Sequence, residues 1–413
     1  MVESAARRTF IAAFLGWTLD AFDFFLLTFV IARIATSFER TVAEVAVAIT
    51  LTLMCRPLGA LLFGWIGDRY GRRTPLMVDI ACYSLIELLT AFSPNFTVFL
   101  VLRALYGVAM GGEWGLGAAM AMEALPPKRR GLFSGMLQEG YMVGFLLAAV
   151  AYYLIFRFTH WDWRGLFVIG VLPSLLIFYI RKNVPESPVW LERRARTVAL
   201  STSSLLKSFA AHWPLVLYAI LFMGAFNALS HGTQDLYATF LQKQHGFSPG
   251  VTSSLAIVAA FGAIAGGIVS GALSQRFGRR ATIIACAVLA ACAIPLWAFS
   301  HTVALLALGA FAMQFMVQGA WGVIPAHLNE LSPGEVRGTF PGFTYQLGNL
   351  LAAGVAQIEA TYAQRFVLPG GAFNYGAAMA MVVVLVLACV VALTAIGYLV
   401  RREGREVAFT GSG

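Results

Sequence analysis

The chain has 413 residues, of which 59% are hydrophobic and only 12% are charged, whereas about 25% of the residues in soluble domains are charged. A lipid-crossing helix needs about 20 apolar residues, so this composition supplies roughly 12 crossings. That leaves no room for a separate soluble catalytic domain. The five cysteines lie in apolar runs without paired spacing, which argues against disulfides and metal sites. We expect an all-α polytopic membrane protein that is not an enzyme and has no cofactor.

Apolar runs bounded by charges, Pro or Gly predict twelve membrane helices. The first six are expected near residues 9–33, 44–67, 74–92, 96–123, 131–155 and 164–182. The second six are expected near residues 213–241, 250–274, 280–299, 302–329, 337–362 and 373–400. A segment rich in Ser, Arg and Thr, residues 183–212, separates the two sets. The predicted organisation is an N-terminal bundle (1–182), a cytoplasmic linker (183–212) and a C-terminal bundle (213–413).

The basic residues give the orientation. Lys and Arg gather in the loops on one side of the predicted helices and are sparse on the other side. By the positive-inside rule, this asymmetry places both termini in the cytoplasm of a multi-pass cell-membrane protein. The net charge of +9 is then explained by topology in the lipid bilayer, so we expect no nucleic-acid partner.

The chain repeats itself at a constant offset of 207 residues, which relates Arg69 to Arg276 and Trp114 to Trp321. Glu123 and Arg130 correspond in the same way to Glu330 and Arg337. One offset serves three loops and spans six helices, an even number. The two halves are therefore predicted to be parallel six-helix repeats, an arrangement typical of transporters.

Residues 64–73 read GWIGDRYGRR, which matches the G-x-x-x-D-R-x-G-R-R loop of the major facilitator superfamily. Together with the repeat, this loop makes the chain resemble that superfamily over its whole length. The resemblance implies a gate, in which Gly64 permits close helix packing and Asp68 meets the positive N-terminal end of the eleventh helix. Residues 185–191 resemble the PESPxWL element of several facilitator families and are expected to support this gate. The predicted gate residues are Gly64, Asp68, Arg69, Arg72, Arg73, Glu123, Arg130, Arg276, Arg280, Glu330 and Arg337, although some of the arginines could merely anchor the loop.

The seventh helix narrows the resemblance. Residues 227–239 read NALSHGTQDLYAT, which fits the N-x-x-[ST]-H-x-x-[ST]-Q-D-x-x-x-T pattern of the lactate/pyruvate permeases in the sialate:proton symporter family. Asn227, His231 and Asp235 recur every four residues, so on one helix they form a polar stripe. Such a stripe is expected to face a water-filled cavity.

Ionisable groups in the bilayer are costly unless they are paired or hydrated, so each is a functional candidate. Arg56 offers a bidentate fork for a substrate carboxylate, and the resemblance supports that role. The alternative is a structural pair with Asp20 or Glu113. The predicted substrate-binding residues are Arg56, Asn227, His231, Tyr345, Gln346 and Asn349, where the two amides could instead make an inter-helix hydrogen bond. The predicted proton carriers are Asp20, Asp235 and Glu139, followed by Asp23 and Glu113.

These features predict a monomeric symporter that imports a small monocarboxylate, lactate or pyruvate, together with a proton. The nearest alternative is a proton symporter for sialic acid, a dicarboxylate or a zwitterionic osmolyte. The chain lacks the GxxxGPxxGG pattern of drug-efflux antiporters in its fifth helix. A receptor or channel would need neither the buried Arg and acid set nor duplicated gates.

Overall fold

The computed structural model describes all residues except 1, 160, 197–201, 370, 372 and 401–413. The described part is almost entirely helical, and eleven of its helices are long and apolar enough to cross a membrane. The major facilitator fold predicted from the sequence is confirmed. The end of the predicted C-terminal bundle (401–413) and part of the predicted linker (197–201) lie outside the described residues, and the bundle boundaries remain predictions.

The first half contains α1 to α9, which correspond to the first six predicted helices. Their bounds are α1 (Val2–Ser37), α2 (Val42–Tyr70), α3 (Arg73–Ala91), α4 (Phe96–Met110), α5 (Glu113–Ala124), η1 (Pro127–Arg129), α6 (Arg130–Gln138), α7 (Gly140–Phe158), α8 (Trp163–Ile169) and α9 (Ser174–Asn183). The predicted helix 96–123 bends at Gly111 and Gly112. A Cβ atom on Gly111 would lie 2.1 Å from the carbonyl oxygen of Arg56, so only glycine permits this approach of α4 to α2.

The second half follows two short helices in the predicted linker region. The bounds are α10 (Pro188–Arg196), α11 (Thr202–Ala211), α12 (Trp213–Gln234), α13 (Tyr237–Thr239), η2 (Phe240–Gln244), α14 (Pro249–Phe277), α15 (Arg279–Ala298), α16 (Val303–Leu331), η3 (Gly334–Val336), α17 (Phe340–Ala352), α18 (Val355–Arg365) and α19 (Tyr375–Val400).

The predicted helix 337–362 is interrupted rather than continuous. It begins at Phe340 and is broken at Ala353 and Gly354, between α17 and α18. The amide of Ala353 bonds to the carbonyl of Leu350 at 3.4 Å, a tightened turn that ends α17, and glycine then disfavours continuation of the helix. The two pieces together make the crossing that is absent from the eleven long helices.

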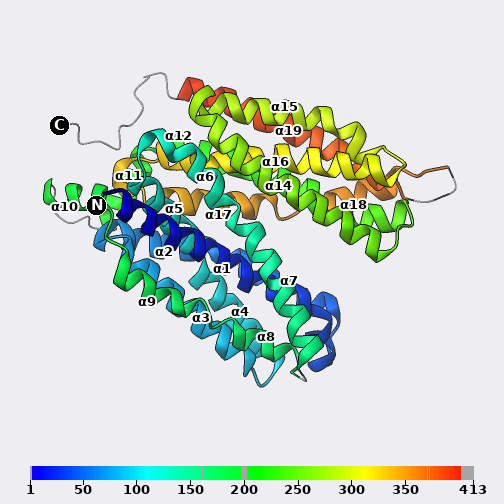
Figure 1. Cartoon of the computed structure of the whole chain (residues 1–413), viewed down its shortest axis with the longest axis horizontal. Helices are drawn as coiled ribbons and strands as arrows, with labels where there is room; N and C mark the ends of the chain where they lie inside the picture. The colour runs from blue at the N-terminus through cyan, green and yellow to red at the C-terminus, as the bar shows by residue number, and fades with distance from the viewer. Residues whose placement is uncertain (1, 160, 197–201, 370, 372, 401–413) are drawn as a thin grey trace.

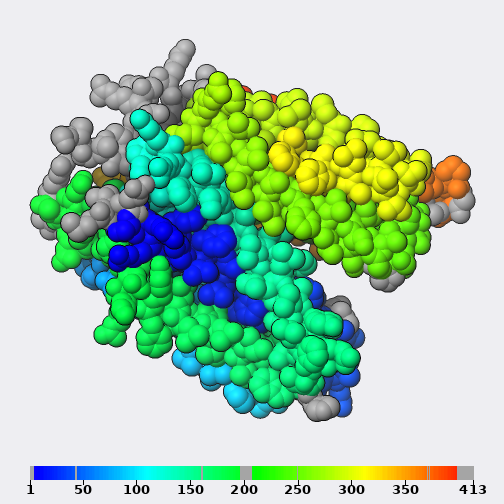
Figure 2. Space-filling model, in the orientation of Figure 1, coloured from blue at the N-terminus to red at the C-terminus, as the bar shows by residue number. Residues whose placement is uncertain are grey.

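The helices form two groups that meet at one end of the molecule and diverge at the other (Figure 1). We call the end where α1 begins and α2 finishes the closed end, and the end where α1 finishes at Ser37 the open end. In the space-filling view the two groups touch at the closed end, and a notch separates them at the open end (Figure 2). The molecule is therefore shaped to admit a solute from the open end.

Small residues lie at the contact between the two halves at the closed end. Helix α6 packs against α14, and α2 and α5 pack against α17. A Cβ atom on Gly135 would lie 2.2 Å from the carbonyl oxygen of Gly267, and one on Gly64 would lie 2.6 Å from Cα of Thr339. The backbones of the two halves are thus in direct contact at the closed end, as small residues allow at helix interfaces.

Candidate functional site

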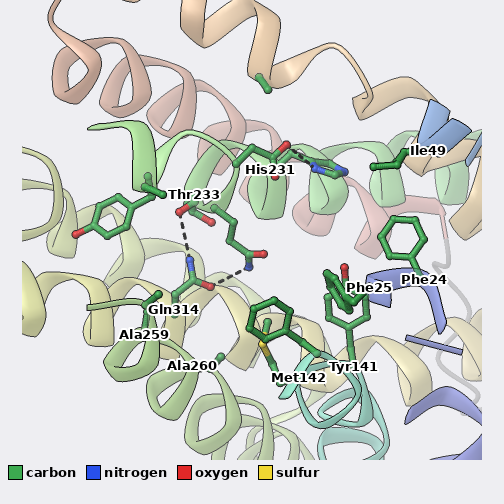
Figure 3. A pocket seen from close by; sticks show the side chains of 18 of the residues that line it. Phe24, Phe25, Ile49, Tyr141, Met142, His231, Thr233, Ala259, Ala260 and Gln314 are labelled. Carbon is green, nitrogen blue, oxygen red and sulfur yellow. Dashed lines mark hydrogen bonds and ion pairs between the residues drawn. The ribbon is translucent and has the colours of Figure 1, made fainter. Parts of the chain in front are cut away.

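A cavity of about 680 Å³ lies between the two halves, toward the open end. Its first-half wall comes from α1, α2 and α7, and its second-half wall comes from α12 to α18 with the short η2. Figure 3 shows His231 and Gln314 on the second-half side, facing Phe25, Tyr141 and Met142 on the first-half side. The wall is thus largely apolar, with polar groups gathered on one side, as in a typical small-molecule site.

The polar stripe predicted on the seventh helix reaches this cavity in part. Nδ1 of His231 lies 3.0 Å from a carboxylate oxygen of Asp235, one turn further along the chain. Nε2 of His231 lies 3.2 Å from Oδ1 of Asn349 on α17. All three residues line the cavity, and the side chains of His231 and Asp235 are 30% and 39% exposed. They form a hydrogen-bonded chain that can meet both solute and water.

Two further polar residues of the cavity were not predicted from the sequence. Gln234 donates to the side-chain oxygen of Gln314 at 3.0 Å, and Gln314 donates to the carbonyl of Thr233 at 3.5 Å. Gln234 lies inside the permease-like motif, which could have indicated it. Gln314 lies in the apolar run of α16, one turn before a second glutamine, Gln318, so its sequence signal is a pair of amides on one face of a predicted membrane helix.

Three predicted substrate-binding residues lie deeper than the cavity wall. Asn227 is buried and donates to the carbonyl of Met223 on its own helix at 2.8 Å. The ring of Tyr345 lies between Trp114 and Trp321, with centroid distances of 4.7 Å and 5.8 Å. Gln346 is also buried. The two tryptophans are counterparts in the sequence repeat, so Tyr345 marks the place where the repeats meet.

Arg56 also lies behind the cavity, in an ion pair with Asp20. Its Nη2 is 3.1 Å from Oδ2 of Asp20, and both side chains are almost fully buried. The side chains of Tyr106, Tyr141 and Tyr345 lie near the guanidinium. Tyr141 lines the cavity, so this ring stands beside the buried pair and also faces the solute.

Two other predicted proton carriers of the first half, Asp23 and Glu113, are buried without hydrogen-bond partners among the described residues. Neither carboxylate oxygen of Asp23 or Glu113 has one, and the same is true of Asp79 on α3. Arg103 on α4 forms an ion pair with Glu87 on α3 at 2.6 Å. Glu139 is buried on the junction with α14, where a Cβ atom on Gly267 would collide with its carboxylate. Among the cavity-lining residues that the structure describes, Asp235 is the one predicted carrier.

At the closed end, Asp68 lies at the beginning of α17. Its carboxylate accepts hydrogen bonds from the amides of Gly338 and Thr339 at 2.8 and 2.9 Å, and from the Thr339 hydroxyl at 2.7 Å. Arg72 is 3.0 Å from Asp68 and 3.4 Å from Glu123. Asp68 therefore links the two halves, while Arg72 holds it to its own half.

The PESPxWL-like segment reinforces this contact. Glu186 accepts from the amide of Arg72 at 2.8 Å, and the indole of Trp190 donates to the carbonyl of Asp68 at 3.0 Å. Arg193 donates to the same carbonyl at 3.1 Å. Burial, together with the like charge of Arg72, lowers the pKa of Arg193. Its surroundings therefore disfavour the charged form of the guanidinium.

The remaining predicted gate residues are spread around the closed end. Arg73 donates to the backbone of Arg181, and Arg130 donates to the carbonyl of Met122 at 2.8 Å. Glu330 pairs at 2.8 Å with Arg279, which was not among the predicted gate residues. Arg337 is buried, whereas Arg69 and Arg276 lie over aromatic rings of their own helix ends.

Glu359 on α18 was also missed from the sequence. It is fully buried, and neither of its oxygens has a hydrogen-bond partner among the described residues. It lies near Asp235 on the cavity wall, without a hydrogen bond between the two carboxyl groups. An acid inside the predicted helix 337–362 is itself the signal that could have indicated it.

Two helical bundles that enclose a cavity and close at one end have the fold of a membrane transporter. The chain belongs to the Major Facilitator Superfamily, whose family model matches residues 13–357. The solved structure of the proton:xylose symporter XylE has the same fold, with a TM-score of 0.75 over 97% of this chain and 96% of that one, at 17% identity.

Relatives of known name are more similar in sequence. A probable 4-methylmuconolactone transporter of Cupriavidus pinatubonensis is 31% identical over 84% of this chain and 82% of its own length. A carboxylic acid transporter protein homolog of Saccharomyces cerevisiae is 31% identical over 87% of this chain, and the match spans 62% of the yeast protein. The sialic acid transporter NanX of Escherichia coli is 28% identical over 87% of this chain and 88% of its length.

Proposed function

We propose that the protein is a proton-coupled symporter that imports small monocarboxylates such as lactate and pyruvate across the cell membrane. The observation that carries this proposal is the chain from Asn349 through His231 to Asp235, which two helices present to one cavity. An imidazole between an amide and a carboxylate can bind an organic acid and also handle a proton. A relative named as a carboxylic acid transporter supports an organic acid as the substrate.

In this proposal Arg56 holds the substrate carboxylate once Asp20 releases it. The two residues now pair at 3.1 Å, so a substrate anion has to compete with an anion already in place. Protonation of Asp20 removes that competitor and leaves a buried guanidinium without a counter-charge. A buried ion that has lost its partner is strongly unfavourable, so the freed guanidinium attracts the substrate carboxylate.

This exchange provides a reason for obligatory coupling. Substrate without a proton places two anions beside one guanidinium, whereas a proton without substrate leaves the guanidinium unpaired. Both cases raise the cost of passing through a dry, closed state. Asp20 is the first proposed proton carrier, followed by Asp235, which lines the cavity, and Glu139, which lies on the junction with α14. Asp23 and Glu113 are proposed as proton carriers of lower rank.

The contacts at the closed end support alternating access. Asp68 joins the first half to the start of α17, and Arg72 and Glu123 complete a buried ion network around it. Separation of the halves at this end requires these hydrogen bonds to break. We propose that they form the gate that holds the closed end shut while the cavity takes up substrate from the open end.

A second candidate is symport of a larger organic acid, such as sialic acid, a dicarboxylate or a zwitterion. A cavity of about 680 Å³ has room for more than lactate, and Phe25, Tyr141 and Trp297 give it aromatic walls. Relatives named as sialic acid, niacin and cis,cis-muconate transporters agree with this broader range.

The decisive experiment is uptake by the purified protein in proteoliposomes, with and without an inward proton gradient. Labelled L-lactate, pyruvate, sialic acid, niacin and muconate are compared, and protein-free liposomes measure passive permeation of the protonated acids. Gradient-driven accumulation of lactate or pyruvate is the expected result. Accumulation of only a larger acid selects the second candidate, and uptake of lactate without any response to the gradient contradicts proton coupling.

A further inference from the structure

A carboxyl group that neither the sequence motifs nor the relatives point to lies beside the cavity. Glu359 extends from α18 toward α12, and a Cβ atom on Gly232 would lie 3.2 Å from its Oε1. The absence of a side chain at Gly232 leaves the space that the carboxyl group occupies. Glu359 therefore lies directly behind the helix turn that carries His231 and Asp235.

The surroundings of Glu359 contain little that could stabilise a negative charge. Helix α18 packs against α12 and α19. From α12, the titratable groups near it are Asp235, whose carboxyl group lies close enough for charge repulsion, and His231, which is hydrogen-bonded to Asp235. The described residues of α19 contain no charged group, and Val383 of that helix lies against Gly232.

Its own helix adds no counter-charge close by. The titratable residues of α18 are Tyr362 and Arg365, and the Arg365 guanidinium lies over the ring of Tyr362, 5.6 Å from its centroid. Val355, one turn before Glu359, belongs to a small apolar cluster with Ala352 and Val382. A carboxylate with no partner in such a setting is far less favourable than the neutral acid.

Asp235 strengthens this preference and also provides a route for the proton. Two neighbouring carboxyl groups in a water-poor site resist being ionised together, so one of them keeps a proton. Asp235 is the more exposed of the two and is bonded to His231. Glu359 is fully buried. The proton is therefore stored on Glu359 and exchanged with water through Asp235.

We propose that Glu359 is a proton-binding site of the second helical half, loaded from the cavity through Asp235; this inference rests on the proton symport proposed above. A proton from cavity water binds Asp235 and passes to Glu359 through a bridging water, because the two carboxyl groups are not hydrogen-bonded to each other. The O–H bond on Asp235 breaks as the water gains that proton, and the water gives up a proton as the O–H bond on Glu359 forms. The helix break at Ala353 and Gly354 lies one turn away, and no atom lies within 4 Å of a Cβ placed on Gly354. Movement of α18 about this break would change the surroundings of Glu359 and release the proton.

The first test needs no transport. Infrared difference spectra of the purified protein report the carbonyl stretch of protonated carboxylic acids. Glu359→Gln should remove one component of this band, and the matched control Glu39→Gln should not, because Glu39 is exposed at the end of α1. An unchanged band in Glu359→Gln overturns the proposal, whatever the transported solute is.

The second test uses proteoliposomes under a pH gradient. With one proton per acid, a gradient of one pH unit supports about tenfold accumulation. Glu359→Gln should slow gradient-driven uptake to the rate seen in protein-free liposomes, while exchange of labelled for unlabelled acid through the protein continues. Glu359→Asp keeps an acid at this position and should restore part of the accumulation. If Glu359 had a merely structural role, the glutamine variant would accumulate the acid at least as well as the aspartate variant, so comparing the two variants separates the roles. If the wild type and Glu359→Gln both accumulate acid tenfold, this inference is wrong and the symport proposal stands. If the wild type accumulates no acid, the symport proposal fails, and the infrared band still decides whether Glu359 holds a proton.

Discussion

The contact between Asp68 and α17 makes a quantitative prediction for Asp68→Asn. One oxygen of Asp68 accepts from Gly338, and the other accepts from both the amide and the hydroxyl of Thr339. Asparagine keeps one oxygen and replaces the other with a donor, so the Thr339 amide loses its acceptor, the Thr339 hydroxyl has to turn and accept instead, and the remaining bonds no longer go to a charged group. Hydrogen bonds to a charged group contribute about 1.5–3 kcal/mol each, and water compensates in part when the gate opens, so we expect a loss of about 2–4 kcal/mol. This shifts the equilibrium toward the open gate by about 30- to 1,000-fold.

Hydrogen–deuterium exchange measures this shift at the amides that Asp68 holds. Exchange of Gly338 and Thr339 should accelerate by about the same factor in Asp68→Asn, because these amides exchange only when the contact opens. Asp162→Asn is the matched control, since Asp162 also accepts from a helix-start amide, that of Arg164 at 2.9 Å, but at the open end. Its effect should be confined to α8. Unchanged protection of Gly338 and Thr339 in Asp68→Asn would falsify the idea that this carboxylate holds the closed end together.

Three further predictions concern the proposed transport cycle. Arg56→Lys keeps the charge beside Asp20 but loses the bidentate fork, so folding should persist while kcat/KM for the acid falls by about 30-fold or more, measured as initial uptake. His231→Ala should raise the KM about 10- to 100-fold through loss of a hydrogen bond to a charged solute. Asn227→Ala should have a smaller effect, because the Asn227 amide bonds within its own helix. Equal effects on the KM would mean that exposure to the cavity does not decide which residue binds the solute. Asp20→Asn should abolish gradient-driven accumulation yet retain exchange, and if it accumulates normally, Asp235→Asn becomes the next variant to measure.

The helices were predictable because the hydrocarbon core of the bilayer restricts which residues a crossing segment can contain. Every crossing needs a long apolar run, and α3 (Arg73–Ala91) and α15 (Arg279–Ala298) lie within two residues of their predicted bounds. Interruptions inside a run were not predictable in this way. The break at Ala353 and Gly354 depends on a local backbone turn, and glycine occurs just as often in unbroken membrane helices such as α14.

The site was predictable only to the level of residue type and helix face. The spacing of His231 and Asp235 placed both on one face, and the structure brings them to the cavity with Asn349 from another helix. The same spacing included Asn227, which instead turns to the carbonyl of Met223. Which polar residue on a stripe reaches the cavity depends on how far the two halves have separated at that depth. Periodicity along a single helix holds no information about that separation.

The distribution of charge between the halves gives each of them a different part in the proposed cycle. In the first half, Asp20 pairs with Arg56, and Glu113 is buried close by. At the corresponding positions of the repeat, Asn227 and Ala320 are neutral. A buried guanidinium cannot lose its charge under physiological conditions, so only an exchange of anions around it can keep that region neutral. The second half has no such constraint, because its acids can be neutralised by protons alone. Under the proposed mechanism the first half therefore recognises the substrate charge and takes up a proton on Asp20 in the same exchange. The second half contributes hydrogen bonds and a further proton site that can be filled or empty without leaving an unpaired cation.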